Sequence, residues 1–269
     1  MQKTVVFQSF RTENVPVGIE RCMASVRQWA ESQNIAYRFF DDAFFDRVPE
    51  KVKEACGAHL LPKTDYARLV VAQELFDEGF GRVIWMDADL LVFSPEKLTI
   101  PDFPYAITRE FWVEAGPMGQ ANVASRFANA AMLLTSENAF FSVYRQLLDL
   151  MVASGRRIGH LSFGTDLLSL LSQSIPFHTW PGIGLFSPAL LKDVAAGGGN
   201  CIDAHRRVAG NQLAAGNICL SLINAKDRGS NLTSEIVEKA IEALCATKGE
   251  VLNGPADAPF QIMRRRNRN

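Results

Sequence analysis

Two acidic side chains, Asp87 and Asp89, interrupt an apolar run in the stretch GRVIWMDADLLVFSP, residues 81–95. Because one residue separates them, an extended or turning backbone can direct both carboxylates to one site from the same side. Two carboxylates repel each other unless a cation or solvent offsets the repulsion. Their oxygens favour hard ions such as Mg²⁺ or Mn²⁺, which share a few carboxylates with the phosphates of a ligand. The pair therefore predicts either a cation site for a diphosphate or an ordinary solvated turn.

The first part of the chain predicts the start of a parallel sheet. Residues 3–10 and 35–42 are rich in β-branched and aromatic side chains and indicate two strands. Residues 17–34, which lie between them, place apolar side chains at the spacing of an amphipathic helix. A strand, a helix and a strand in succession favour parallel pairing.

A second helix and strand place the two aspartates at the edge of this sheet. The helix is expected over residues 63–78 and ends before Gly79, a residue typical of helix ends. The strand that follows, residues 82–86, is uniformly apolar, so we expect a central strand that is covered on both faces. Ligands of open α/β sheets collect outside the carboxyl ends of the strands, and Asp87 and Asp89 fall there.

The rest of the chain completes a single α/β domain with a mostly parallel central sheet, flanking helices and a loop-rich C-terminal part. The expected elements are strands near residues 105 and 127, a helix over 139–155, a helix over 164–173 with Thr165 as its N-cap, loops over 176–230 and a last helix over 234–249.

Composition limits the classes of function. The chain has 269 residues, 48% of them hydrophobic, with 28 Lys plus Arg against 29 Asp plus Glu, which is typical of a soluble globular domain and does not favour nucleic acid as a partner. No apolar run approaches the ~18 to 20 residues that cross a bilayer, and the first residues lack a signal-peptide pattern, so a cytoplasmic location is expected. Five scattered cysteines indicate reduced thiols rather than a zinc site. The basic run at 264–269 allows a weak association with the inner face of a membrane.

Asp65 and Arg68 lie three residues apart in the helix before the aspartates, so they share a face and can form an ion pair. A surface pair of this kind contributes on the order of 0.3 kcal/mol. The alternative interpretation gives Arg68 a phosphate to bind.

The stretch TDYARLVVAQELFDEGFGRVIWMDADLLVF, residues 64–93, resembles the core of the retaining GT-A glycosyltransferases, the group that contains glycosyltransferase families 8 and 32. In that group a D-x-x-R helix leads into a strand and a D-x-D motif, which binds the metal and the diphosphate of a nucleotide-sugar. Here the two motifs lie about twenty residues apart, and the resemblance covers roughly residues 3–170. It implies a GT-A, Rossmann-like domain.

The resemblance also assigns roles to residues outside the two motifs. Gln8, Phe10 and Arg11, at the end of the first expected strand, match positions that meet the nucleotide, together with Asp65, Arg68 and Asp87. Asn129, in RFANAAMLLT, is similar to the family's F-N-S-G-x-M-L strand beside the donor sugar, although shifted by one residue. Asp166, in GTDLLSLL, matches part of the D-Q-D motif of family 8, with Leu167 in place of the Gln. Asp166, Arg68 and Asn129 are therefore the catalytic candidates.

A third metal ligand, commonly a late His, would be expected beside Asp87 and Asp89. His205, in DAHRRVAG, is the candidate, although the family's Lys-Pro-Trp does not follow it. The competing histidines are His59, His160 and His178.

Taken together, the resemblance implies a metal-dependent, retaining glycosyltransferase of the hexosyltransferase type. It would use Mn²⁺ or Mg²⁺ and a nucleotide-sugar, most simply a UDP-sugar, and transfer the sugar to a glycan or a lipid-linked glycan in polysaccharide biosynthesis. The metal with Arg68 would meet the leaving diphosphate, and Asp166 would orient the sugar or acceptor. Residues 1–100 would form the nucleotide-binding half of one domain spanning 1–269, residues 101–250 the sugar and acceptor half, and residues 251–269 a tail.

Other interpretations remain open. An apolar strand followed by D-x-D is also the nucleophile motif of haloacid dehalogenase-type phosphatases, in which Asp87 would attack phosphorus. Against this, Leu91 stands where that group has Thr or Val, and no later acidic pair supplies its Mg²⁺ site. An EF-hand is disfavoured because residues 92–96 lack its glycine and spaced ligands. A non-catalytic nucleotide-sugar-binding module is the third interpretation.

Three aromatic residues, Phe111, Trp112 and Trp180, are expected in irregular segments. There they either stack on a sugar or base, or close the core.

Overall fold

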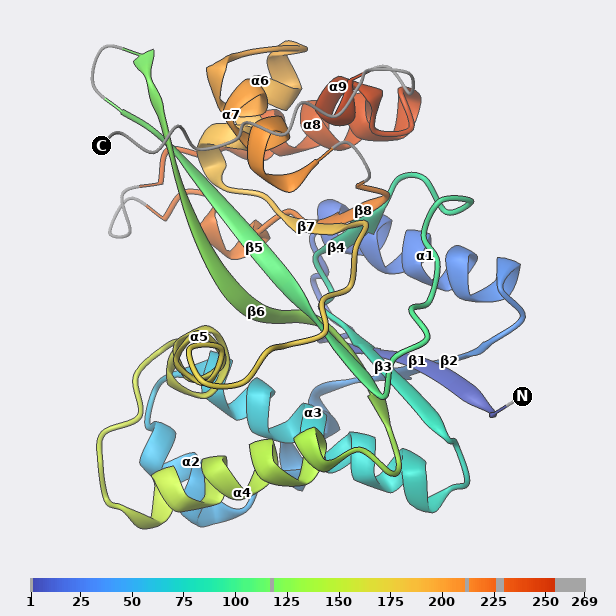
Figure 1. The fold of residues 1–269 in the computed structure, drawn as a ribbon, viewed down its shortest axis with the longest axis vertical. Helices are drawn as coiled ribbons and strands as arrows, with labels where there is room; N and C mark the ends of the chain where they lie inside the picture. The colour runs from blue at the N-terminus through green and yellow to red at the C-terminus, as the bar shows by residue number, and fades with distance from the viewer. Residues whose placement is uncertain (1, 117–118, 211–212, 226–229, 255–269) are drawn as a thin grey trace, which may run out of the picture.

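The computed structural model describes residues 2–116, 119–210, 213–225 and 230–254, and Figure 1 shows their arrangement. The strands are β1 (Thr4–Ser9), β2 (Ala36–Phe40), β3 (Arg82–Met86), β4 (Leu90–Val92), β5 (Tyr105–Ala115), β6 (Ala121–Thr135), β7 (Ile183–Leu185) and β8 (Ala215–Asn217). The helices are α1 (Val17–Ser32), α2 (Glu50–Cys56), α3 (Leu60–Asp77), α4 (Ala139–Ala153), α5 (Leu167–Leu171), α6 (Pro188–Ala196), α7 (Asn200–Ala209), α8 (Ser234–Ala246) and α9 (Glu250–Asn253), with short turns η1 (Asp42–Arg47), η3 (Ser162–Asp166) and η4 (Leu220–Leu222).

Five strands form the central sheet in the order β2-β1-β3-β6-β5. β1 pairs in parallel with β2 and β3, β6 is antiparallel to β3, and β5 is antiparallel to β6. Within this sheet only β6 runs against the other strands, so the prediction of a mostly parallel α/β sheet is confirmed. β3 lies in the middle and Val83–Met86 are buried, which confirms a central strand covered on both faces.

Helices cover both faces of this sheet because its strands are apolar on both. Val83 and Trp85 of β3 pack into the layer that contains α3 and α4, whereas Ile84 and Met86 pack toward α1. Figure 1 shows α3 and α4 below the sheet and α1 above it. α3 ends as predicted, because Gly79 follows it with φ +90°, a backbone conformation that favours glycine.

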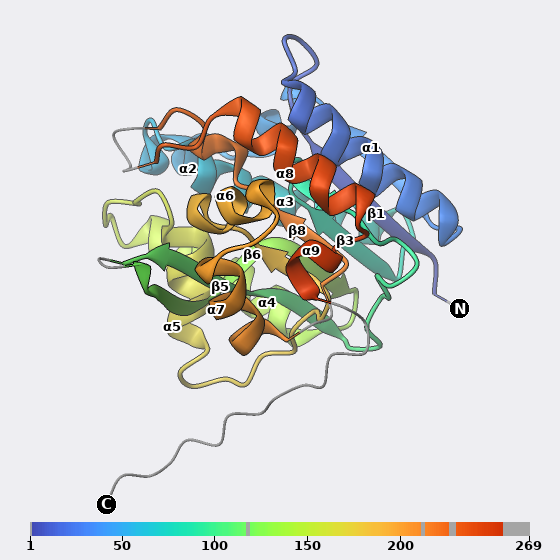
Figure 2. The ribbon, with the colours of Figure 1, turned by 90° about the horizontal axis from the view of Figure 1, so that it is seen from above.

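A second sheet of three short strands, in the order β4-β8-β7, lies beside the first. β8 pairs antiparallel with β4 and parallel with β7. β4 begins one residue after Asp89, so the chain leaves the central sheet through the two aspartates and enters the second sheet. Side chains of α6, α7 and α8 pack together with Leu91 of β4, and Figure 2 shows these helices on the side facing the viewer.

The prediction of loops over residues 176–230 is wrong, since β7, α6, α7 and β8 lie there. Ser187 is the N-cap of α6, and its Oγ accepts a hydrogen bond from Leu190 N–H at 3.2 Å; Gly197, with φ +78°, is the C-cap. These elements have only 3 to 10 residues, so their periodicity is weak and burial against the rest of the fold determines them.

The helix predicted over 164–173 is also shorter than expected. α5 spans Leu167–Leu171, and the π-type turn η3 precedes it with a kink at Gly164 (φ −99°, ψ −105°). Asp166 occupies the N-cap position without a side-chain cap bond, so the prediction of Thr165 as the cap is wrong.

No helix in the described part of the chain is long and apolar enough to cross a membrane. The basic run at 264–269 lies outside the described residues.

The second sheet leaves no room for a side chain at Gly216 in β8. A Cβ there would lie 2.3 Å from the Phe186 ring, so we expect Gly216→Ala to lower the free energy of unfolding by about 1–3 kcal/mol. The matched change Gly198→Ala meets no atom within 4 Å and should stay within about 0.5 kcal/mol of wild type. Urea denaturation of the two variants provides the comparison, and equal midpoints would contradict this packing.

Candidate active site

The turn Asp87-Ala88-Asp89 joins β3 of the central sheet to β4 of the second sheet. Asp87 N–H donates to the Ala130 carbonyl of β6 at 2.8 Å. Ile218 N–H, just after β8, donates to the Asp89 carbonyl at 3.0 Å. Backbone bonds to both sheets therefore fix the directions of the two carboxylates.

Asn217, the last residue of β8, bridges the two carboxylates. Its Nδ2 donates to Asp87 Oδ2 at 3.0 Å and to Asp89 Oδ1 at 2.7 Å. Its Oδ1 accepts from Cys219 N–H at 2.8 Å, which sets the orientation of the amide, and Leu220 N–H donates to Asp89 Oδ2 at 3.0 Å. Both carboxylates therefore face the Asn217 side-chain NH₂ group, which carries a partial positive charge.

The guanidinium of Arg68 connects three elements behind Asp87. Its Nη2 lies 3.1 Å from Asp65 Oδ1 and 3.4 Å from Asp87 Oδ1, and its Nη1 donates to the Asn129 carbonyl at 2.6 Å. Trp85 also donates to Asp87 Oδ1 at 2.7 Å, and its ring lies 4.5 Å from the guanidinium carbon. The side chains of Arg68 and Asp65 are 2% and 1% exposed, so the expected pair forms as a buried bridge and not at the surface.

The site carries excess negative charge. Arg68 pairs with Asp65 and Asp87, and Asp89 lies beside Asp87, so three carboxylates and one guanidinium give a formal charge of −2 when all are ionised. Burial raises the pKa of Asp65 to about 6, against the attraction of Arg68. Burial and the charge of Asp87 raise the pKa of Asp89 to about 7, and burial also raises the pKa of Asp87. The group therefore favours the uptake of positive charge.

The donor set at this point fits a hard divalent cation. Asp87 Oδ2 and Asp89 Oδ1 converge on one amide, and a turn of that amide would present Asn217 Oδ1 as a third oxygen. Mg²⁺ and Mn²⁺ need only one or two carboxylates when phosphates supply further oxygens. The Asp87 side chain is 26% exposed, so a ligand can reach it.

The structure does not bring His205 to the aspartates. No group of three His, Cys, Asp or Glu side chains suited to a metal occurs among the residues described. His205 is 1% exposed in α7, and its ring lies 6.4 Å from Phe111 and 6.2 Å from Phe186. Burial lowers its pKa to about 4, so it is a neutral core side chain. A His near the C-terminus is weak evidence for a metal ligand, because a His is also found in the buried face of a helix.

The other histidines lie on different segments. The rings of His59, before α3, and His160, before η3, are 6.1 Å apart, and the His178 ring stacks on Phe103 at 4.4 Å. The described structure therefore does not place any of them in a metal-ligand group.

Asn129 joins Asp65 to the helical layer. Its Nδ2 donates to Asp65 Oδ1 at 2.9 Å and to the Tyr144 hydroxyl at 3.3 Å, and that hydroxyl donates to the Phe163 carbonyl at 2.5 Å. Asn129 is only 8% exposed, so it supports Asp65 in the present structure. The turn η3 packs against α3 and β6, which carry this network, and ends at the exposed Asp166.

The first strand places its candidate residues in two different environments. Gln8 is fully buried, its Nε2 donates to the Asp87 carbonyl at 3.0 Å, and its Oε1 accepts from Tyr37 at 3.1 Å. Both ends of this amide are thus used within the protein. Phe10 is partly exposed and Arg11 is exposed, with the Arg11 guanidinium carbon 5.3 Å from the Phe10 ring centroid. A cavity of about 490 Å³ lies beside them, lined by Arg11, Thr12, Glu13, Asn14 and Asp42.

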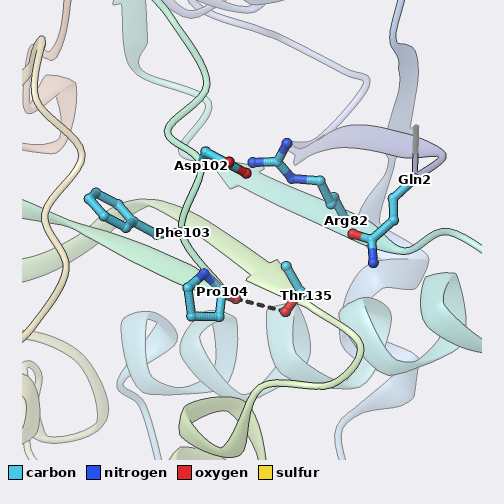
Figure 3. A pocket seen from close by; sticks show the side chains of 6 residues that line it. All are labelled: Gln2, Arg82, Asp102, Phe103, Pro104 and Thr135. Carbon is cyan, nitrogen blue, oxygen red and sulfur yellow. Dashed lines mark hydrogen bonds between the residues drawn. The ribbon is translucent and has the colours of Figure 1, made fainter.

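A second cavity, of about 480 Å³, lies at the opposite ends of the strands (Figure 3). Arg82, the first residue of β3, and Thr135, the last residue of β6, lie there. The Thr135 Oγ1 donates to the Pro104 carbonyl at 2.9 Å. Its one carboxylate, Asp102, has no second acid or metal-binding side chain among the lining residues, which are Gln2, Arg82, Asp102, Phe103, Pro104 and Thr135. We therefore place the chemistry at Asp87.

Sequence reasoning missed Asn217 and Trp85 as partners of the aspartates. Asn217 lies 130 positions from Asp87, in a strand of three residues without a recognisable motif. Trp85 belongs to the apolar run of β3, and its indole N–H next to D-x-D is a signal that could have been used. Trp180 is 1% exposed and belongs to the core, whereas Phe111 and Trp112 lie in β5, so the expectation of irregular segments was wrong for these two.

No known protein family matches the chain, and no curated protein matches it. Among solved structures, it is similar to a glycosyltransferase involved in the glycosylation of the major capsid of PBCV-1, with 10% identity, 90% of this chain and 98% of that chain covered, and a TM-score of 0.42. Mouse xyloside xylosyltransferase 1 has 13% identity, coverage of 82% and 98%, and a TM-score of 0.45. The inositol-1-phosphate CTP transferase from T. maritima has 11% identity, coverage of 90% and 96%, and a TM-score of 0.36. All three TM-scores lie below 0.5, so these similarities are too distant to assign a function. The function is inferred from the residues of the site.

Removal of the buried guanidinium should destabilise the fold. We expect Arg68→Met to cost about 3–5 kcal/mol because it leaves the Asp65 carboxylate buried without its counter-charge. The double variant Arg68→Met with Asp65→Asn should recover part of this loss. Arg38→Met removes an exposed pair with Glu78, whose side chains are 53% and 51% exposed, and should cost at most about 1 kcal/mol. Equal losses for Arg68→Met and Arg38→Met in urea denaturation would contradict the role of Arg68.

Asp89 should make metal-free stability depend on pH. Between its ordinary value of 3.8 and the raised pKa of about 7, the folded protein holds a proton that the unfolded chain has released. The free energy of unfolding contributed by this group therefore falls as pH rises through that window, by at most about 1.4 kcal/mol per pH unit. Asp89→Asn lacks this dependence, so its stability relative to wild type should increase from pH 4 to pH 7, measured by denaturation in EDTA. Parallel curves would contradict the raised pKa.

Proposed function

We propose that the protein is a metal-dependent glycosyltransferase that moves a sugar from a nucleotide-diphosphate sugar to an acceptor. The observation that carries this proposal is the convergence of Asp87 and Asp89 on one point at the carboxyl end of β3, with Arg68 behind them. A formal charge of −2 at a strand end where Asp87 is partly exposed suits a divalent cation that is shared with a diphosphate.

Asp87, Asp89 and the amide oxygen of Asn217 would hold the cation, Mn²⁺ or Mg²⁺. When bound, it supplies Lewis-acid stabilisation of the leaving diphosphate. Arg68 acts from behind: it fixes the Asp87 carboxylate and prevents a change of its direction. Trp85 donates to Asp87 Oδ1, the oxygen nearest Arg68, and Asp87 Oδ2 faces the Asn217 amide, where the cation would lie.

The nucleoside would lie at the end of β1. The cavity beside Arg11 has an exposed guanidinium, and two of its lining residues, Glu13 and Asp42, are acceptors for ribose hydroxyls. Phe10 and Arg11 would contact the base, while Gln8 acts through the backbone of Asp87. A UDP-sugar is the simplest donor.

The sugar and the acceptor would bind in the second half of the chain. Residues 1–100 would bind the nucleotide and residues 101–250 the sugar and acceptor, as halves of a single GT-A-like domain. Asp166, exposed at the end of η3, would orient the acceptor, a glycan or lipid-linked glycan, and transfer would retain the anomeric configuration. With these roles the protein would act in polysaccharide biosynthesis, in the cytoplasm.

Direct binding tests the cation site. We expect UDP to bind in the presence of Mn²⁺ and to lose at least about 100-fold in affinity after EDTA treatment or in Asp89→Ala, because the cation links the protein to the diphosphate. Isothermal titration with UDP and GDP measures this. Undiminished binding in Asp89→Ala would overturn the site.

Asn217 and His205 form a matched pair for the third ligand. Asn217→Ala should weaken Mn²⁺ binding by roughly 10-fold or more, whereas His205→Gln should leave it unchanged in protein that remains folded. Mn²⁺ binding followed by electron paramagnetic resonance distinguishes the two. If His205→Gln weakened Mn²⁺ binding and Asn217→Ala did not, His205 would be the third ligand.

The phosphatase alternative has a separate test. Release of phosphate from phosphomonoesters that depends on Asp87 would favour it.

A further inference from the structure

The hairpin of β5 and β6 continues from the aspartates along one face. Ala130 of β6 accepts the backbone bond of Asp87, and two and four residues earlier the same face carries Ala128 and Arg126. The register between β5 and β6 shifts between Ala128 and Met132, so Arg126 lies in the regularly paired part of the hairpin beyond this shift. Figure 1 shows the hairpin extending from the sheet toward α6 and α7.

An ion pair lies on this face. Glu110 of β5 is opposite Arg126 in the register, and the Arg126 Nη2 is 2.8 Å from Glu110 Oε1. The Glu110 side chain is 3% exposed and that of Arg126 is 38% exposed, while the Arg126 Nε is buried without a hydrogen-bond partner. A buried carboxylate in a strand is costly, and the pair by itself adds little to stability.

Cys219 connects this pair to the cation site. Its N–H holds the Asn217 amide, while its side chain and that of Trp112 pack against Ala128, Ala130 and Leu185. Trp112 is partly exposed, and the Arg126 guanidinium carbon lies 5.9 Å from its ring centroid.

We propose that Glu110, Arg126 and Trp112 form the subsite for the transferred sugar and that this sugar is uncharged. The inference rests on the proposed function and specifies its substrate class. The partly exposed Arg126 guanidinium offers donors to sugar hydroxyls, and the Trp112 ring offers an apolar face, while the buried Glu110 carboxylate holds the guanidinium in place and sets its charge. Because Glu110 neutralises Arg126, the subsite has no free positive charge for the carboxylate of a uronic acid.

The distribution of charge in the site also favours a donor with a charged diphosphate and an uncharged sugar. The diphosphate would meet the cation, which would carry the accessible positive charge of the site, because Arg68 is buried behind Asp87. A sugar carboxylate would instead approach the buried Glu110 as well as Asp87 and Asp89, and like charges disfavour one another.

The test compares donors that differ only in the oxidation of one carbon. The full-length chain with Mn²⁺ is titrated with UDP, UDP-glucose, UDP-glucuronate, UDP-galactose and UDP-galacturonate, and with GDP, GDP-mannose and GDP-mannuronate. In the pair that binds best relative to its bare nucleotide, the neutral sugar should bind at least 10-fold more tightly than the uronate. Equal affinity or preference for the uronate in that pair would overturn the subsite while leaving the proposed function intact. If neither UDP nor GDP binds, the proposed function fails first.

Two variants separate sugar recognition from a structural role of the ion pair. Glu110→Gln keeps the shape but frees the charge of Arg126, so affinity for the uronate should rise about 10-fold with no change for the bare nucleotide. Arg126→Gln should lower the affinity for the neutral sugar to that of the bare nucleotide. Glu114→Gln is the matched control, an exposed carboxylate on the same strand that accepts from the Trp112 indole at 3.2 Å, and should change neither. Loss of bare-nucleotide binding in both folded variants, with circular dichroism unchanged, would assign the pair a structural role and overturn the proposal.

Discussion

The buried guanidinium of Arg68 holds the candidate site together. It contacts its own helix through Asp65, the end of β3 through Asp87 and the backbone of β6 through Asn129. Burial of a charge costs several kcal/mol unless partners surround it, and here two carboxylates, a carbonyl and an indole ring do so. Because these partners come from three elements, the contacts of Arg68 hold α3, β3 and β6 in one relative position, in which the Arg68 Nε and Asp65 Oδ2 are left without a hydrogen-bond partner in the described structure. The direction of the Asp87 carboxylate follows from that position.

A second constraint comes from the far end of the chain. Asn217 reaches Asp87 across 130 positions and Asp89 across 128, through a short sheet in which β8 pairs with both β4 and β7. The aspartates therefore acquire this partner only after the C-terminal half has packed on the first. Contacts of such separation are costly in loop entropy, so the site depends on cooperative folding of both sheets.

Sequence reasoning could predict what local spacing determines. The position of D-x-D after a central strand, the parallel β1–β2 pair and the Asp65–Arg68 pair all follow from residues close in the chain. Long-range partners could not be predicted in this way. Asn217 and the Glu110–Arg126 pair depend on strand register, and the elements between residues 176 and 230 are too short to show a period. His205 lies in the core of the described structure, and sequence alone does not distinguish a buried neutral His from a metal-bound one.

The repulsion between Asp87 and Asp89 affects both the stability of the free protein and its affinity for a cation. Asp87 and Asp89 are held close together by backbone bonds to two sheets, so their repulsion cannot be relieved by movement. The Asn217 amide and raised pKa values reduce it in the free protein. A divalent cation would remove it more completely, since it supplies two charges where the amide supplies a partial one. The same pair that destabilises the free protein would therefore bind a cation strongly, and the energy comes from repulsion that the fold maintains.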